Sequence, residues 1–263
     1  MQRQSNSPIQ SAFVLFKNLQ YLAPNHRKYI QGMISDRILK GKARVYAIVD
    51  AETCEQKKID IHEFTKVLLN NGIQIIQYRD KINPLDKIRN NFDKILSFSS
   101  KYDSVCIIND YLDVALEFNS AVHLGQEDGD SPEPLVSMSF EDSSPGESVE
   151  ASLDSRINYG RSTHSLQEIG AAMKSEPTPS YIAYGPVFSS TTKPALAQAN
   201  ESLSEIVECY PGDIVFIGGI TGENLQQLPE GERFFYAIIS GFFSDDPGYK
   251  FEKKIRRIFD AIK

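Results

Sequence analysis

The sequence predicts an α/β protein, a (β/α)8 TIM barrel with an N-terminal helical extension. From residue 44 onward, eight short apolar segments follow one another, and helical patterns lie between most of them. Strands that are apolar throughout are typical of a parallel sheet covered by helices. Most of these segments end in polar or glycine-rich groups, as expected where a barrel binds its ligand at the C-terminal ends of its strands. The length of 263 residues suits one such domain.

The expected elements follow the chain in a regular order. The predicted strands cover residues 44–50, 72–79, 104–109, 121–124, 157–162, 181–188, 213–218 and 234–240. Helical patterns lie between most of these strands, for example over residues 61–69, 84–100, 111–118, 165–174 and 202–209. Eight units favour a closed barrel over an open sheet. An open doubly wound sheet would carry a glycine-rich turn after its first strand, and residues 49–52 (Val-Asp-Ala-Glu) are not such a turn.

Residues 1–43 are predicted to form the helical extension, and residues 44–263 the barrel domain. Apolar residues recur at helical spacing on both sides of residues 23–25 (Ala-Pro-Asn), which indicates two amphipathic helices. We expect a helical hairpin that packs on the barrel. Because the extension holds seven basic residues and one acid, a targeting segment is an alternative, as is binding to a membrane surface or a partner.

Residues 129–156 break the alternation, because they are rich in Ser, Glu, Asp and Pro and have a poor helical pattern. We expect a long loop that replaces or displaces the fourth barrel helix. Loops of this length are either mobile and solvated or functional, so a lid over the site is the alternative to a solvated loop.

The composition is that of an ordinary soluble globular protein, with 41% hydrophobic and 24% charged residues. The net charge is −7, and the acidic excess lies outside the basic extension. An acidic body repels nucleic acid, and no apolar run approaches the length of a membrane span. Three widely spaced cysteines favour a reduced, cytoplasmic setting. The sequence leaves a homo-oligomer open.

The second predicted strand ends in an amide and two cations. Side chains alternate along a strand, so Gln77, Arg79 and Lys81 can point in the same direction. At the barrel mouth, Arg79 would offer a planar fork to phosphate oxygens and Lys81 a compact charge. The alternative is a solvated, charged strand end.

The third and fourth strands offer carboxylates. Asn109 and Asp110 end the third strand, and Asp128 follows the fourth. Mg2+ takes oxygen ligands and often needs only one or two carboxylates together with substrate phosphates, so Asp110 and Asp128 are a candidate Mg2+ site. The competing role for Asp110 is the N-cap of the helix that begins near Tyr111.

The remaining strand ends are compatible with a phosphate. Ser162 can donate to an anion, although a helix cap is its competing role, and His164 beside it is by itself more often structural. The sixth strand runs into a hydroxyl run that ends in Lys193. The seventh and eighth strands end at residues 216–220 and 237–241, where glycines let the backbone approach a ligand closely. In barrels these last two loops often form the phosphate site.

Six motifs in this order give a resemblance to a known family. They are residues 77–81, 108–110, 123–128, 162–164, 185–188 with 192–194, and 217–220. Over roughly residues 44–263 the chain resembles thiamine phosphate synthases, which join hydroxymethylpyrimidine diphosphate to thiazole phosphate and release diphosphate. The resemblance implies a Mg2+-assisted transferase of thiamine biosynthesis that needs no covalent residue.

By position, the resemblance also implies roles for the site residues. The implied contacts of the pyrimidine diphosphate are Gln77, Arg79, Lys81, Asn109, Ser162 and Lys193, of which Arg79, Lys81, Ser162 and Lys193 are the candidate catalytic residues. The implied Mg2+ ligands are Asp110 and Asp128, and the implied contacts of the thiazole phosphate are Ser190, Thr191, Thr192, Gly219, Ile239 and Ser240.

The chain also departs from the family pattern. The approach to His123, residues 118–122, is about one residue short, residues 195–200 lack the usual glycine-bearing segment, and residues 231–236 lack the usual small-residue run. Two alternatives therefore stay open. One is a thiazole tautomerase that uses His164 as an acid–base group, and the other is a ligand-binding relative without catalysis. The full pyrimidine-diphosphate set favours the synthase.

Overall fold

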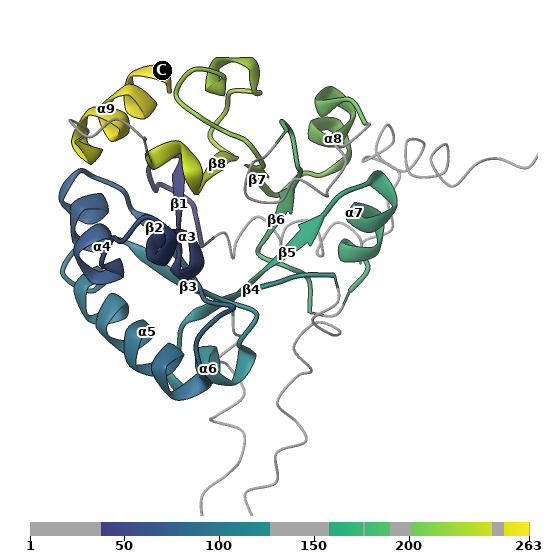
Figure 1. Cartoon of the computed structure of the whole chain (residues 1–263). Coiled ribbons are helices and arrows are strands. Elements are labelled where there is room, and N and C mark those ends of the chain that lie inside the picture. The colour runs from purple at the N-terminus through teal and green to yellow at the C-terminus, as the bar shows by residue number, and fades with distance from the viewer. Residues whose placement is uncertain (1–37, 127–157, 176, 190–200, 244–249, 263) are drawn as a thin grey trace, which may run out of the picture.

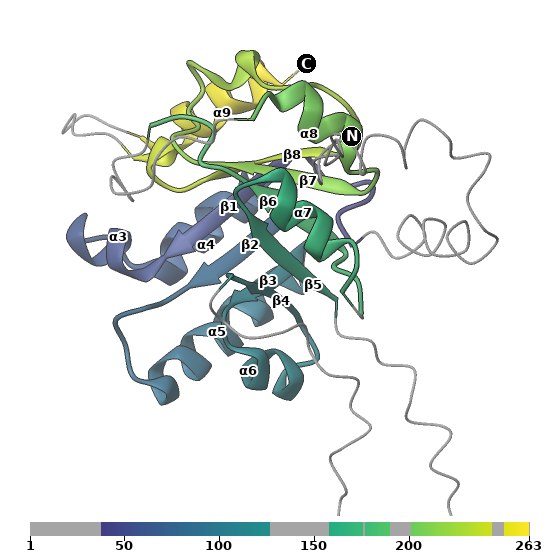
Figure 2. The same cartoon turned by 90° about the vertical axis from the view of Figure 1, so that its right-hand side faces the viewer.

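The structure, a computed structural model, describes residues 38–126, 158–175, 177–189, 201–243 and 250–262. Within these residues, eight parallel strands close into a barrel in the order of the chain, from β1 to β8. Helices surround the barrel, as Figures 1 and 2 show. The prediction of a (β/α)8 barrel is confirmed. Residues 1–37 and the predicted loop at 129–156 lie outside the described residues.

The strands follow the predicted ones closely. They are β1 (Val45–Asp50), β2 (Ile75–Arg79), β3 (Val105–Asn109), β4 (Ala121–Leu124), β5 (Tyr159–Thr163), β6 (Tyr181–Tyr184), β7 (Asp213–Ile217) and β8 (Phe234–Ile238). The strand β2 begins later than predicted because Gly72, with φ at +86°, lies in the turn that ends the preceding helix. The strand β6 ends at Tyr184, and Pro186 has no N–H for a sheet ladder.

All five predicted helices are present within one or two residues. They are α4 (Ile61–Asn70), α5 (Leu85–Ser99), α6 (Leu112–Glu117), α7 (Leu166–Ala172) and α8 (Leu203–Cys209). The helices α3 (Ala51–Gln56) and α9 (Phe251–Ala261) are absent from the prediction, as are the 3-10 turns η4 (Leu225–Gln227) and η5 (Ser240–Phe242). In Figure 1 the viewer looks onto the end of the barrel where α3 lies.

The barrel separates two apolar layers, and alternation along each strand assigns residues to one or the other. On β1, Tyr46 and Ile48 belong to the inner cluster, while Val45, Ala47 and Val49 belong to the cluster between sheet and helices. Leu39 is fully buried in the inner cluster. The described end of the predicted extension therefore enters the barrel core at its N-terminal end, while the boundary at residue 43 stays a prediction.

The described helices also bear on the question of membrane association. None of the helices within the described residues has the length and apolarity that a bilayer crossing needs.

Candidate active site

A cavity at the C-terminal end of the barrel receives side chains from every strand. The apolar and glycine residues on its wall are Ile48, Ala183, Gly185, Pro186, Val215, Ile217, Gly218, Gly219, Ile220, Ala237 and Ile239. The polar residues on its wall are Tyr46, Gln77, Arg79, Asn109, His123, Ser162, His164 and Ser240. Residues from all parts of the sequence thus meet in one place, as expected at this end of a (β/α)8 barrel.

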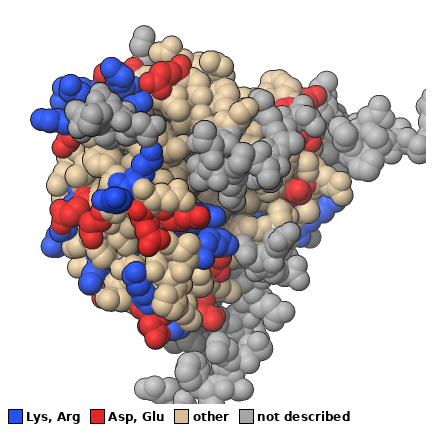
Figure 3. Space-filling model, in the orientation of Figure 1, with Lys and Arg blue, Asp and Glu red and all other residues tan. Residues whose placement is uncertain are grey.

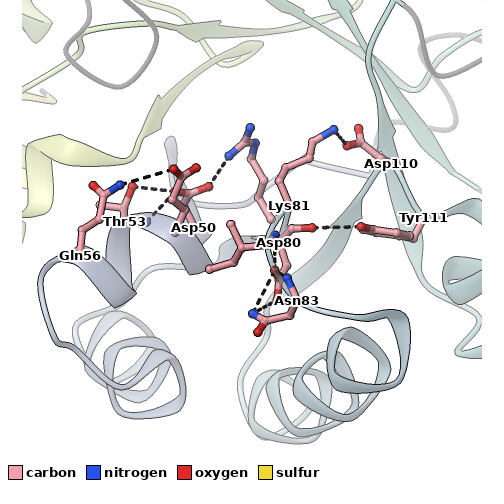
Figure 4. Close-up of polar contacts among 11 residues, drawn as sticks. Asp50, Thr53, Gln56, Asp80, Lys81, Asn83, Asp110 and Tyr111 are labelled. Atoms are coloured by element: carbon pink, nitrogen blue, oxygen red, sulfur yellow. Dashed lines mark hydrogen bonds and ion pairs between the residues drawn. The ribbon is translucent and has the colours of Figure 1, made fainter.

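The two predicted cations at the end of β2 and just beyond it are each held by an acid from a neighbouring strand end. The Arg79 Nη1 atom lies 2.5 Å from Oδ1 of Asp50, a residue that is only 2% exposed at the end of β1. The Lys81 Nζ atom forms an ion pair with Oδ2 of Asp110, just beyond β3. Figure 4 shows Lys81 reaching toward Asp110, with Asp50 on the neighbouring strand end. The cations are therefore held in place by carboxylates before any ligand arrives.

Besides its ion pair with Arg79, Asp50 is the N-cap of α3. Its Oδ2 accepts hydrogen bonds from the Thr53 amide at 3.0 Å and the Thr53 hydroxyl at 2.6 Å. Asp is a preferred N-cap residue because its carboxylate satisfies the unpaired N–H groups of the first turn. The same side chain therefore starts α3 and holds Arg79.

The loop after β2 is built around Asp80, which lies between the two cations in sequence but is buried. Its Oδ1 accepts from the amides of Ile82 and Asn83 at 3.1 and 3.0 Å, and its Oδ2 accepts from the Tyr78 hydroxyl at 2.5 Å. The Tyr111 hydroxyl donates to the Asp80 carbonyl at 3.1 Å (Figure 4). Burial opposes ionisation of Asp80, but the hydrogen bonds from Tyr78 and Asn83 outweigh it and lower the pKa of Asp80.

Asp110 occupies an unusual backbone conformation at the end of β3. Its φ is +69°, in the left-handed region that few residues other than Gly, Asn and Asp adopt. Its amide donates to the His123 carbonyl at 2.8 Å. The N-cap of α6 is Tyr111, without a side-chain cap. The competing role for Asp110 as a helix cap is therefore not the one the structure shows.

A chain of polar groups fills part of the barrel interior below the cavity. The Gln77 Nε2 donates to the Tyr46 hydroxyl at 2.9 Å, and that hydroxyl lies 2.8 Å from the Tyr181 hydroxyl. The Tyr181 hydroxyl lies 3.0 Å from Nδ1 of His123, whose Nε2 lies 3.0 Å from the Ser162 Oγ. Ser165, not Ser162, is the N-cap of α7. Ser162 is thus tied to the interior and faces the cavity.

The opposite side of the cavity is formed by backbone. Gly218 and Gly219 have φ values of +104° and +62°. A Cβ on Gly218 would lie 2.5 Å from Pro186, and a Cβ on Gly219 would lie 2.3 Å from the Ser189 carbonyl oxygen. Glycine is required at both positions, since a side chain would both clash and disfavour the backbone conformation.

His164 lies on the cavity wall with one ring nitrogen engaged. Its Nδ1 lies 3.1 Å from Oε2 of Glu168, and the same oxygen accepts from the His164 amide at 2.7 Å. The imidazole is therefore oriented by α7, with Nε2 as its second polar atom.

Comparison with known proteins assigns this barrel to a family. A sequence model described as thiamine monophosphate synthase matches residues 45–242, which is most of the chain. The chain belongs to this family. The family resemblance predicted from the six motifs is confirmed.

Curated members of the family include thiamine-phosphate synthases. The protein of that name from Caldicellulosiruptor bescii is 31% identical over 205 residues, which cover 76% of this chain and 84% of the relative. The one from Persephonella marina is 29% identical over 219 residues, which cover 82% of this chain and 95% of the relative.

Solved structures show the same fold. Thiamine phosphate pyrophosphorylase from Pyrococcus furiosus superposes with a TM-score of 0.62 at 24% identity and covers 87% of this chain and 97% of its own. The pyrophosphorylase from Bacteroides thetaiotaomicron superposes with a TM-score of 0.52 at 13% identity.

The predicted site residues of this family member fall into two groups. Those that line the cavity are Gln77, Arg79, Asn109, Ser162, Gly219, Ile239 and Ser240, and the linked pair Lys81–Asp110 follows directly on the strand ends that carry Arg79 and Asn109. Those outside the described residues are Asp128, Ser190, Thr191, Thr192 and Lys193. The structure therefore brings together every predicted site residue that it describes, while their roles stay predictions.

Four polar residues in or around the cavity were not predicted as site residues. They are Asp50, Tyr46, Tyr181 and His123. Alternation on β1 could have indicated that Tyr46 points into the barrel, because it lies on the same face of the strand as Ile48 and on the face opposite to the helix-facing Val49. No sequence pattern pairs Asp50 with Arg79, because this contact depends on the register between β1 and β2, in which these two residues are partners.

Proposed function

We propose that the chain is a thiamine-phosphate synthase that joins hydroxymethylpyrimidine diphosphate to thiazole phosphate and yields thiamine phosphate and diphosphate. The observation that carries the proposal is the convergence of Arg79, Asn109, Ser162 and the glycine wall at residues 218–219 on one cavity of a family member. Cations and neutral donors on one side suit the diphosphate. The backbone wall on the other side suits the thiazole phosphate.

The chemistry needs stabilisation of a departing anion more than a protein nucleophile. The bond between the pyrimidine methylene carbon and the diphosphate oxygen breaks, and its electron pair leaves with diphosphate. The thiazole nitrogen supplies the pair for the new C–N bond and becomes the positive thiazolium nitrogen. Arg79 and Lys81, together with Lys193, stabilise the negative charge that develops on the leaving group.

Gln77, Asn109 and Ser162 are the neutral polar groups that we assign to orientation of the pyrimidine substrate. Correct alignment of the methylene carbon with the thiazole nitrogen accounts for much of the rate in a reaction of this kind. The described cysteines do not compete as nucleophiles, because burial raises the pKa of Cys54 and of Cys106 to about 12.

The residues present fit a magnesium ion. Asp110 offers a carboxylate at the rim, and Asp128 is the second proposed ligand. Among the described residues no group of three or more His, Cys, Asp or Glu side chains could hold a metal, so the proposed site depends on one or two carboxylates together with substrate phosphates. Bound there, Mg2+ would neutralise charge on the diphosphate.

The decisive experiment mixes the purified chain with both substrates and Mg2+ and measures diphosphate release. Release only when both substrates are present is the expected result. Isomerisation of thiazole phosphate without diphosphate release would instead indicate the tautomerase, for which the oriented His164 is the available acid–base group. Binding of either substrate without reaction would indicate a ligand-binding relative.

A further inference from the structure

A row of hydrogen-bonded polar side chains lies inside the barrel, and four of its members are almost fully buried. Tyr46, Gln77, His123 and Tyr181 are 1%, 3%, 6% and 0% exposed. Buried polar groups are stable only when each donor finds an acceptor, and each hydroxyl in the row has a single proton to place. The donor and acceptor in each hydrogen bond are therefore determined by the group at the end of this row of polar side chains.

We propose that Tyr46, Tyr181 and His123 are positioning residues that fix the imidazole as its Nε2–H tautomer and thereby make Ser162 a hydrogen-bond donor to the substrate. The role of Ser162 as a donor to the substrate rests on the proposed function. The assignment of the His123 tautomer does not depend on that function.

The argument starts at Gln77. Its amide nitrogen donates to the Tyr46 oxygen, which leaves the Tyr46 proton for the Tyr181 oxygen at 2.8 Å. The Tyr181 proton is then directed to Nδ1 of His123 at 3.0 Å. An imidazole that accepts at Nδ1 carries its proton on Nε2 when it is neutral.

The last link reaches the cavity. The Nε2–H group of His123 donates to the Ser162 Oγ at 3.0 Å. The serine oxygen is thus an acceptor toward the interior, and its own proton points elsewhere. Because Ser162 lies on the cavity wall, that proton is available to an acceptor atom of a bound ligand.

The opposite direction leaves a buried proton without a partner. If Nδ1 of His123 donated to Tyr181, then Tyr181 would donate to Tyr46, whose oxygen would accept two hydrogen bonds. The described contacts of the Tyr46 hydroxyl are those with Gln77 and Tyr181, so its proton would have no acceptor there. An unsatisfied buried hydroxyl is costly. Burial also raises the pKa of both tyrosines, so neither can act as a phenolate acceptor.

The packing around Tyr181 holds its ring in one position. Its ring stacks on His123 with centroids 5.6 Å apart and planes inclined by 21°. Room for the ring exists only because residue 160 on β5 is glycine, where a Cβ would lie 2.0 Å from the Tyr181 Cζ. Both the ring and its hydroxyl are thus confined.

The test is the 15N spectrum of the imidazole rings in the full-length chain labelled at its four histidines. The His123 signals are assigned by their loss in His123→Gln. We expect the neutral Nε2–H tautomer in the unchanged chain and a mixture of tautomers in Tyr181→Phe. An Nδ1–H tautomer, or protonation of both nitrogens, in the unchanged chain would overturn the proposal, and this measurement does not depend on enzyme activity.

Kinetics provide the second readout. Tyr181→Phe is expected to raise KM for the pyrimidine diphosphate about tenfold with a smaller change in kcat, because a ground-state donor is lost. The matched control is Tyr159→Phe, which removes a buried tyrosine hydroxyl from the outer side of β5, where it donates to the Pro177 carbonyl at 2.6 Å. The control is expected to keep the tautomer and KM. If Tyr181→Phe kept both as well, the relay would be wrong, whereas the correct tautomer in a chain without synthase activity would contradict only the proposed function.

Discussion

At the scale of single residues, the two predicted cations that the structure describes each pair with a carboxylate from a neighbouring strand end. Arg79 faces Asp50, and Lys81 faces Asp110. In a chain with a net charge of −7, long cationic side chains have many alternative carboxylate partners. A fixed local partner keeps them directed at the cavity mouth, so less ordering is required when an anion binds.

Arg79→Ala tests this pairing from the side of the cation. Loss of one donor aimed at developing charge costs about 2.7–4 kcal/mol of barrier, so we expect kcat to fall about 100- to 1000-fold while the far-ultraviolet circular dichroism is unchanged. Arg89→Ala is the control, because Arg89 pairs with Glu117 on the exposed outside, 2.9 Å away. Equal activity in the two variants would remove Arg79 from the mechanism.

Asp50→Asn tests the same pairing from the side of the acid. Asn is as good an N-cap as Asp, so α3 keeps its cap while Arg79 loses its charged partner. We expect a loss of unfolding free energy of about 1–3 kcal/mol and a smaller loss of kcat than in Arg79→Ala, measured by urea unfolding and by diphosphate release. Asp60→Asn makes the same change at the exposed N-cap of α4 and should alter neither activity nor, by more than a few tenths of a kcal/mol, stability.

The site could be predicted from sequence only where a polar residue directly follows or ends an apolar strand. Gln77, Arg79, Asn109 and Ser162 end apolar strands, and parallel strand ends meet at one rim, so their convergence follows from the fold. Tyr46 and Tyr181 are ordinary aromatic residues in apolar strands. Their hydroxyls meet across the barrel interior, a contact between strands far apart in sequence that no local pattern encodes.

At the scale of elements, the sequence predicts what periodicity controls and misses what capping and register control. The five predicted helices have clear apolar stripes. The helix α3 is six residues long and begins because Asp50 caps it, so it has too few turns for a period to emerge. The helix α9 does carry a stripe, with Ile255, Ile258 and Ala261 buried, but it follows the last strand and so lies outside the helical segments between strands.

The close contact of β5 and β6 predicts opposite effects for two Gly→Ala substitutions. A Cβ at Gly160 would overlap the Tyr181 ring at 2.0 Å, whereas a Cβ at Gly170 on α7 meets nothing within 4 Å. We expect Gly160→Ala to lower the unfolding free energy by about 1–3 kcal/mol through overpacking and Gly170→Ala to raise it by about 0.5–1 kcal/mol. Chemical unfolding of the two variants measures both values. Stabilisation by both substitutions would show that Tyr181 can move aside.

The loop after β2 predicts a pH dependence. The pKa of Asp80 is lowered from its ordinary value near 3.8, so ionised Asp80 stabilises the folded state above that value, and this stabilisation is lost as the pH falls through the lowered pKa. The gap in unfolding free energy between the unchanged chain and Asp80→Asn should therefore be constant at neutral pH and shrink below about pH 4. Asp86→Asn, at an exposed position on α5, is the control, and a constant gap down to pH 2 would contradict the role given to Asp80.

At the scale of the whole molecule, the proposed function requires an acidic protein to bind two anionic substrates. Basic and acidic side chains are interspersed over the described part of the face shown in Figure 3, so this part offers no broad attraction to an anion. Binding of the proposed substrates would then depend on the few cations fixed at the rim and on the proposed metal. Diphosphate affinity should therefore depend steeply on Mg2+ and only weakly on the distant surface charges, which salt screens.

Thermal unfolding with and without ligand tests that dependence in the full-length chain. Ligand at 100 times its Kd adds about 2.7 kcal/mol to the unfolding free energy, which for a domain of this size raises Tm by about 5–11 °C. We expect diphosphate with Mg2+ to give such a shift, and diphosphate with EDTA, or Mg2+ alone, to give little. Asp110→Asn should abolish most of the shift because it removes one proposed ligand to the metal. Asp103→Asn, which loses only its contact with Lys42 outside the cavity, should keep the full shift. A shift of equal size with EDTA would mean that the fixed cations alone bind diphosphate, and the pair of carboxylates would then need a different role.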